Sequence, residues 1–391
     1  MQRNWIAVLF VGVLAVTGMP RWARAQSDMQ WLSVDDARLQ WVNAMAWEAR
    51  AGGLQAVRVP KAQRDQWSQD NEKKRAMSGA GVSVRFRTDS RRIVFRTTLL
   101  EVETVPLATN PEDAWEFNRP PYFSLYREGR YVAAIPGKIQ GAQQEVVILN
   151  DRGPAREAEY QVLFPFYYRN AETVMHAIGL DAGAKIAAAA PDKRPRVLFY
   201  GDSITHGHGV TAPHETYVWQ ACERAGCVSL NFGFGGTGWG ERIVAETIAA
   251  RADWDALVIA IGTNSFGGID GASRQKETAA QYGDKYRAFL DVIRARWPGK
   301  PIISMTPILN RVEILDIRNP NGEMPQDYRN AIERVVRERQ AGDKNIYLVD
   351  GLKLVGDQQD MLVTDLVHPN DFGMRSMAVG VASVLRPLLA R

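Results

Sequence analysis

The chain has 391 residues, a formal net charge of +4 and two cysteines. Its first 25 residues hold three arginines and no acidic residue, so the net charge falls to +1 once this segment is set aside. Nucleic-acid binding requires clustered basic residues, and so small an excess of positive charge does not indicate it. The length is ample for two hydrophobic cores.

Residues 1–25 have the pattern of a secretory signal peptide. Arg3 lies in a short polar start, an apolar run follows over Trp5–Val16, and Ala23-Arg24-Ala25 gives the small-x-small pattern after which signal peptidases cleave. The apolar run is well short of the ~20 residues that a membrane-spanning helix needs. We therefore expect a secreted or periplasmic protein with no membrane span once the signal is removed.

Residues 27–190 are expected to form an all-β, jelly-roll-like sandwich domain. Val82, Val84 and Phe86 alternate with polar residues, which is typical of a half-buried strand. Similar short runs, separated by breaks that contain Gly, Pro or Asp, follow at Tyr122–Tyr126, Tyr131–Ile135, Val146–Leu149 and Tyr160–Phe164. Several short strands at this spacing are typical of a β-sandwich. Ala187–Pro195 is expected to be the linker to the next domain.

Residues 191–391 change to an alternation of strands and helices. The expected strands are Arg196–Tyr200, Val228–Phe232, Ala256–Ile261, Ile302–Met305 and Ile346–Val349. Apolar residues recur at helical spacing over 282–293 and 328–336, and a last helix is expected from about Asp371 to Leu389. Alternating βα units predict an α/β domain with a parallel sheet and helices on both faces. The polar, Gly-rich segments follow the strands, where such sheets carry their sites.

The first of these strands runs directly into Gly201-Asp202-Ser203-Ile204. A nucleophilic serine needs a tight turn between strand and helix, so that its hydroxyl projects clear of the sheet. Gly201 permits such a turn, and Ser203 is the candidate nucleophile. The alternative is a serine that merely caps the next helix.

The second strand ends in a glycine-rich segment, residues 231–238, that contains the GxGxxG pattern of dinucleotide-binding proteins. The acidic residue that should close the following strand is missing there, because Asp253 and Asp255 precede that strand. The competing hypothesis is that the glycines expose a backbone N–H to a reacting oxygen. The third strand ends at Asn264, whose amide is a candidate second donor or, alternatively, an Asx-type loop cap.

The candidate base is His368, in Asp365-Leu366-Val367-His368-Pro369 just before the last helix. A carboxylate three residues earlier in a single turn can bond the imidazole Nδ1 and leave Nε2 to accept the serine proton. Alternatively, Asp365 only structures the loop. His206 and His208 flank a glycine, but two histidines are too few for a metal site, and both are expected to be exposed turn residues.

The two cysteines, Cys222 and Cys227, lie five residues apart around a glycine that can end a helix. In an exported protein they can form a disulfide or remain two buried thiols. The sequence does not decide between these alternatives. Two cysteines without other ligands do not make a zinc site.

Taken in order, Gly-Asp-Ser, the Gly-rich turn, Gly-Thr-Asn and Asp-x-x-His-Pro closely resemble the motifs of the SGNH (GDSL-type) hydrolase family. The resemblance implies a flavodoxin-like, three-layer α/β/α domain and ester hydrolysis without a metal or other cofactor. It also implies a catalytic triad of Ser203, His368 and Asp365. The implied oxyanion donors are the Ser203 N–H, the Gly236 N–H and the Asn264 side chain. Ser265 departs from the family, where many members carry Asp after the Asn.

The N-terminal half is similar, more loosely, to the β-sandwich that precedes the catalytic domain in carbohydrate esterases of this family; residues 123–131 carry that similarity. This similarity implies a serine esterase that removes acetyl groups from carbohydrates, with an acylated carbohydrate as its substrate. Trp239 and Phe266, near two strand ends, either stack on a sugar ring or are ordinary packing residues. The alternatives are a lipid esterase or thioesterase of the same family, and a glycan-binding protein without activity.

Overall fold

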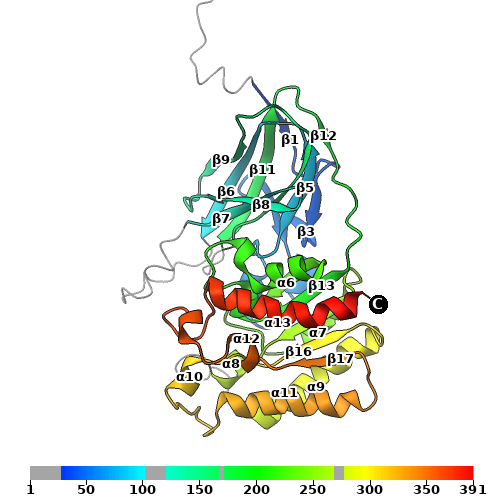
Figure 1. The fold of residues 1–391 in the computed structure, drawn as a ribbon, viewed down its shortest axis with the longest axis vertical. Helices are drawn as coiled ribbons and strands as arrows, with labels where there is room; N and C mark the ends of the chain where they lie inside the picture. Colours follow the sequence, from blue (N-terminus) through cyan, green and yellow to red (C-terminus); the bar gives the residue numbers. More distant parts are fainter. Residues whose placement is uncertain (1–27, 102–119, 167–170, 268–276, 391) are drawn as a thin grey trace, which may run out of the picture.

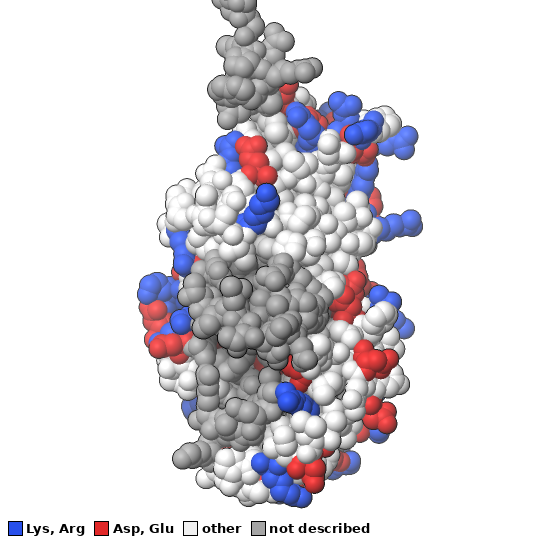
Figure 2. All heavy atoms as spheres, turned by 90° about the vertical axis from the view of Figure 1, so that its left-hand side faces the viewer, with Lys and Arg blue, Asp and Glu red and all other residues white. Residues whose placement is uncertain are grey.

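The computed structural model describes residues 28–101, 120–166, 171–267 and 277–390. The predicted signal segment lies outside these residues. A β-sandwich stands on an α/β domain, with the sandwich uppermost in Figure 1. Among the helices of the described ranges, none is both long and apolar enough to cross a membrane. On the face drawn in Figure 2, the described basic and acidic side chains are interspersed.

The sandwich consists of two antiparallel sheets. The strands of the first, in spatial order, are β3 (Ala46–Arg50), β4 (Gly53–Val57), β11 (Ala171–Asp181), β6 (Arg92–Glu101) and β9 (Gln143–Asn150), with β1 (Met29–Leu32) also paired to β11. Those of the second are β12 (Ile186–Ala187), β5 (Ser83–Thr88), β10 (Ala158–Leu163), β7 (Tyr122–Arg127) and β8 (Arg130–Pro136), with β2 (Gln40–Val42) paired to β5.

The alternating apolar and polar residues of β5 point to opposite faces of the sheet, as the sequence predicts. Val84 and Phe86 are fully buried and belong to the core between the two sheets. Arg85 points the other way and forms ion pairs with Glu159 and Asp192. The described part of the N-terminal half is thus a sandwich, as expected, although short helices also occur within it.

The C-terminal sheet is parallel and has the strand order β14 (Val228–Gly233), β13 (Arg196–Gly201), β15 (Ala256–Ala260), β16 (Ile302–Met305) and β17 (Ile346–Val349). This order, 2-1-3-4-5 within the domain, is that of flavodoxin-like folds. Val197, Leu198, Phe199 and Tyr200 are all fully buried, because helices cover both faces of the sheet. The predicted fold class is therefore confirmed.

The helices form two layers (Figure 1). One face of the sheet is covered by α7 (Arg242–Ala250), α9 (Ala279–Arg296) and α11 (Pro325–Gln340). The other is covered by α6 (Tyr217–Ala225), α13 (Asp371–Leu389) and the short α5 (Ser203–His206) and α12 (Leu352–Val355). The remaining short elements of this domain are α8 (Thr263–Phe266), α10 (Arg311–Ile314) and the 3-10 turns η1 (Pro213–Glu215) and η2 (Gln359–Met361).

The connection between β4 and β5 leaves the sandwich and joins the core of the α/β domain. It contains α2 (Lys61–Arg64) and α3 (Asp70–Arg75). Trp67, between them, is 1% exposed, and its ring meets Phe232 and Phe234 edge-on. Its indole N–H donates to the Thr247 hydroxyl at 3.0 Å. The two halves of the chain therefore share one hydrophobic cluster.

Candidate active site

Ser203 lies at the carboxyl end of β13, in the turn that starts α5. A Cβ at Gly201 would collide with the Thr205 side chain and the Ala260 carbonyl, so the turn requires glycine there. Asp202 caps the helix, because its Oδ1 accepts from the Ile204 N–H at 3.0 Å. The cap described as the alternative role of Ser203 is thus made by its neighbour, and the Ser203 hydroxyl points elsewhere.

That hydroxyl meets His368, and His368 meets Asp365. The Ser203 Oγ lies 2.7 Å from His368 Nε2, and His368 Nδ1 lies 2.5 Å from Asp365 Oδ2. A carboxylate only accepts hydrogen bonds, so Nδ1 carries the proton and Nε2 accepts from the serine hydroxyl. The three residues predicted as a triad are therefore brought together in the order that general-base activation of a serine requires.

The Asp365–His368 turn is tight and is held by the same carboxylate. Asp365 Oδ1 accepts from the N–H groups of Val367 and His368 at 2.8 and 3.0 Å. Leu366 adopts φ +57°, an uncommon conformation for a branched residue. Burial acts to raise the pKa of Asp365, but the His368 charge and these hydrogen bonds outweigh it and hold that pKa below its usual range. Asp365 is thus a carboxylate at neutral pH.

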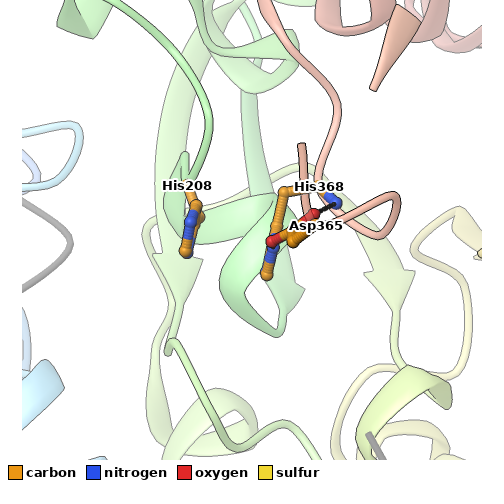
Figure 3. A group of neighbouring side chains, drawn as sticks. All are labelled: His208, Asp365 and His368. Carbon is orange, nitrogen blue, oxygen red and sulfur yellow. Dashed lines mark hydrogen bonds and ion pairs between the residues drawn. The ribbon is translucent and has the colours of Figure 1, made fainter. Parts of the chain in front are cut away.

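His208 stacks on the His368 ring. The two ring centroids are 3.7 Å apart and the planes differ by 6°. Figure 3 shows the two side chains beside each other. His208 comes from the turn after α5, where its backbone N–H donates to the Ser203 carbonyl at 2.9 Å. The prediction that His208 is an exposed turn residue is wrong: it is 7% exposed. Gly207, at φ +113°, ends α5 and turns the chain back toward the triad.

His208, Asp365 and His368 bring three candidate metal-ligand atoms within 4.8 Å of one another. A metal needs lone pairs that converge on one point. The lone pairs of stacked rings lie in separate, nearly parallel planes, and His368 Nδ1 already bonds Asp365. The arrangement fits a hydrogen-bonded triad with a stacked ring better than it fits a metal site.

His206 is likewise not the exposed turn residue that the sequence predicts, since it is 4% exposed. Its Nδ1 accepts from the Gly235 N–H at 3.2 Å, and its Nε2 lies 2.7 Å from the Ser78 hydroxyl of the N-terminal domain. Burial, together with the charges of Arg58 and Arg75, lowers the pKa of His206 well below its usual value. The ring is therefore neutral and connects the two domains.

The glycine-rich loop, residues 233–238, folds over the turn that carries Ser203. A Cβ at Gly235 would lie 3.7 Å from the Ser203 Cβ, and one at Gly238 would lie 3.1 Å from the Asp202 Cα. Gly236 adopts φ +71°, which favours glycine. The loop therefore passes close to Ser203, as the oxyanion hypothesis requires, although a Cβ at Gly236 itself would meet no atom within 4 Å.

Asn264 is the second residue of α8, directly after β15. Its Nδ2 donates to the Thr237 carbonyl at 2.5 Å, so the third strand end is joined to the glycine-rich loop. A primary amide nitrogen carries two N–H groups, and this contact uses one of them. Ser203, the glycine-rich loop and Asn264 thus lie at adjacent strand ends of one sheet.

Two aromatic residues with a suggested sugar-binding role are packed inside the protein. Trp239 and Phe266 are 6% and 1% exposed, and Phe266 meets Tyr328 edge-on in the helical layer. The interpretation that they present a ring face to a sugar is corrected on this ground.

Cys222 and Cys227 are both buried and carry free thiols in this structure. The Cys227 N–H donates to the Cys222 carbonyl.

The sequence of the α/β domain matches a known family over residues 199–375, and that family is described as the GDSL-like Lipase/Acylhydrolase family. The C-terminal half of the chain is a GDSL-like hydrolase domain. The resemblance inferred from the four motifs is confirmed, and the chain is a carboxylic ester hydrolase. No curated protein sequence matches the chain significantly.

Solved structures share the whole two-domain layout. A salicylyl-acyltransferase from a tetracycline biosynthetic pathway superposes with a TM-score of 0.78 at 22% identity, covering 93% of this chain and 99% of its own. A family two carbohydrate esterase from Cellvibrio japonicus gives 0.63 at 15% identity, covering 93% and 98%. An acetyl xylan esterase from Butyrivibrio proteoclasticus gives 0.57 at 12% identity, covering 93% and 99%. At such identities the likeness shows the fold, in which a sandwich precedes the hydrolase domain.

Proposed function

We propose that this chain is a secreted serine esterase that hydrolyses short-chain esters, acetyl esters of carbohydrates above all. The observation that carries the proposal is the chain of short hydrogen bonds from the Ser203 hydroxyl through His368 to the Asp365 carboxylate. A serine hydroxyl is a weak nucleophile until a base accepts its proton, and this arrangement supplies the base in the required tautomer.

In the proposed mechanism, His368 Nε2 takes the proton as Ser203 Oγ attacks the ester carbonyl carbon. Asp365 stabilises the imidazolium that forms, and its lowered pKa keeps it ionised for that purpose. The tetrahedral intermediate collapses as His368 protonates the departing sugar oxygen, which leaves an acyl-enzyme. His368 then activates water, which attacks the acyl carbon and releases acetate and free Ser203.

The negative charge of the tetrahedral oxygen needs donors fixed in advance. We assign this role to the N–H groups of Ser203 and Gly236 and to the Asn264 side chain. The proximity of the glycine-rich loop to Ser203, and the hydrogen bond of Asn264 to that loop, support the assignment. Removal of one such donor typically lowers kcat by about 10²–10³-fold.

The substrate class rests on the fold shared with named carbohydrate esterases. Two of the structures similar to this chain are described as a carbohydrate esterase and an acetyl xylan esterase, and both have the preceding sandwich. Export is part of the proposal, because a polymeric carbohydrate substrate lies outside the cell and residues 1–25 have the pattern of a signal peptide.

Acetate release tests the proposal. The wild type and Ser203→Ala are compared on synthetic esters of increasing acyl length and on a panel of acetylated polysaccharides. We expect rates to fall sharply beyond short acyl groups, and Ser203→Ala to lose at least about 10⁴-fold in kcat with its melting temperature unchanged.

Three results would overturn parts of this proposal. Retention of about a tenth of the wild-type rate by Ser203→Ala would remove the nucleophile. A preference for long acyl chains or thioesters would favour a lipid esterase or thioesterase. Carbohydrate binding without any turnover would favour a glycan-binding protein.

A further inference from the structure

The glycine-rich loop has an intrinsic weakness as an oxyanion donor. Four of its six residues are glycines, and glycine has the greatest backbone freedom of any residue. A donor N–H must be fixed before the reaction in order to stabilise the transition state. The contacts that fix this loop therefore bear on the rate, and several of them come from the N-terminal domain.

Arg58, at the end of the β4 segment, is one such contact. It is fully buried, and its guanidinium donates to the carbonyls of Asn231 and Gly233 at 3.2 and 2.8 Å. Burial, with the Arg251 charge nearby, lowers the pKa of Arg58 to about 9, so it remains protonated at neutral pH. A buried guanidinium that donates to backbone carbonyls fixes the start of the loop.

Arg75, the last residue of α3, reaches the loop at its centre. Its Nε donates to the Gly235 carbonyl at 3.2 Å. The Gly235 carbonyl and the Gly236 N–H belong to one planar trans peptide, in which C=O and N–H point in opposite directions. A hydrogen bond that fixes the Gly235 oxygen therefore fixes the direction of the Gly236 N–H as well.

The other polar group of Gly235 is fixed through a relay. The Gly235 N–H donates to His206 Nδ1, and His206 Nε2 bonds the Ser78 hydroxyl. Because Nδ1 accepts, the neutral ring carries its proton on Nε2 and donates it to Ser78. The Arg58 guanidinium also donates to this hydroxyl, at 3.1 Å. Ser78 and the two arginines all belong to the segment between β4 and β5.

From these contacts we infer that the N-terminal half, through its β4–β5 connection, is a working part of the active site, with Arg75 and Ser78 as positioning residues that orient the Gly235–Gly236 peptide. The inference rests on the proposed function, which makes the Gly236 N–H an oxyanion donor. It assigns to the β4–β5 connection a part in the rate of the chemical step, and it requires no contact between this connection and the substrate.

The test compares Arg75→Met, Arg75→Lys and Ser78→Ala with a matched control in the full-length chain. The control is Arg64→Met, because Arg64 lies in the same segment but pairs with Glu48 and the Val59 carbonyl. We expect Arg75→Met to lower kcat by about 10–100-fold, a part of the loss seen when a donor is removed. KM should stay within about twofold, since the Gly236 N–H stabilises a charge that develops only in the transition state.

Three further readouts separate positioning from simple loss of structure. Inactivation by an alkyl phosphonate, which places an oxyanion on Ser203, should slow by the same factor as kcat. Arg75→Lys keeps a donor and should recover most of the loss. Ser78→Ala should lower kcat several-fold at constant KM, and Arg64→Met should alter neither constant even if it lowers the melting temperature.

The outcomes distinguish this inference from the proposed function. If the wild type hydrolyses esters and Ser203→Ala does not, but Arg75→Met and Ser78→Ala keep wild-type kcat, the inference alone is overturned. An increase of KM at constant kcat in Arg75→Met would also overturn it, because Arg75 would then bind substrate. An inactive wild type, or an active Ser203→Ala, would overturn both.

Discussion

At the scale of single residues, Asp365 uses its two carboxylate oxygens for different purposes. Oδ2 bonds His368 Nδ1, whereas Oδ1 accepts from two backbone N–H groups and holds the turn. The structural and the catalytic roles that the sequence left as alternatives are thus both supported by contacts. Two substitutions at this position separate them.

Asp365→Asn keeps an oxygen for the backbone but presents an N–H to His368 Nδ1. The imidazole must then accept at Nδ1 and carry its proton on Nε2, where it cannot take the serine proton. We expect kcat to fall by about 10³–10⁴-fold with little change in melting temperature. Asp365→Ala loses both oxygens and should lower the rate and the melting temperature together.

Ester-hydrolysis kinetics and thermal melts of the two variants check this prediction. A near-normal rate for Asp365→Asn would reduce the triad to a dyad. A melting temperature that falls equally in both variants would show that Oδ1 is not the oxygen that holds the turn.

The residues of the proposed triad could be located from the sequence because their information is local. Asp365 and His368 lie three residues apart, and Ser203 directly follows a strand. The stacking of His208 on His368 and the burial of His206 could not be predicted, since both depend on how the turn after α5 meets distant segments. Gly207, which ends α5, is the local signal in the sequence that the chain turns sharply at this point.

At the scale of elements, some helices and strands are likewise determined by local sequence, whereas others depend on contacts with distant segments. β16, β17 and α13 have the predicted bounds, because a continuous apolar run or a long helical period determines each of them. α3 has the sequence DNEKKR, which shows no apolar face. Its position comes from contacts with the glycine-rich loop, and those contacts join residues 160 positions apart.

Glu72, in α3, makes the free energy of unfolding depend on pH. Glu72 is fully buried beside the Glu241 carboxyl. Burial, and then the Glu241 charge, raises the pKa of Glu72 from 4.5 to about 8. Between these two values the folded chain holds a proton that the unfolded chain releases. The stabilisation by this proton is complete below pH 4.5 and is lost as the pH rises toward 8.

We therefore expect Glu72→Gln, which keeps the shape but cannot ionise, to flatten the decline of melting temperature between pH 5 and 9. At pH 9 the variant should melt at least ~3 °C above the wild type, which corresponds to about 2 kcal/mol for a chain of this length. Glu246→Gln, at an exposed position on α7, is the control and should follow the wild type. Parallel wild-type and Glu72→Gln curves would contradict the assignment of the proton to Glu72.

At the scale of the whole molecule, the two halves form one cooperative structure. The hydrophobic cluster beneath β13 and β14 contains Val59, Trp67 and Ala76 from the N-terminal half. Buried hydrogen bonds of Arg58, Trp67 and Asn43 also cross between the halves. A sandwich tethered by a flexible linker would show none of these features, whereas a shared core couples the unfolding of both parts.

Calorimetry tests this coupling. The wild type should unfold in one transition whose calorimetric and van't Hoff enthalpies agree, since loss of either half exposes the core of the other. Trp67→Ala and Trp254→Ala each remove a tryptophan that is 1% exposed, and each should cost about 3–5 kcal/mol. Trp254 packs within the hydrolase domain, against Trp297, so its variant should keep a single, lower transition. Trp67 joins the two halves, so only its variant should split the transition into two, with the sandwich melting separately from the hydrolase domain. Two transitions in the wild type, or an unsplit one in Trp67→Ala, would mean that the sandwich and the hydrolase domain do not depend on this shared core.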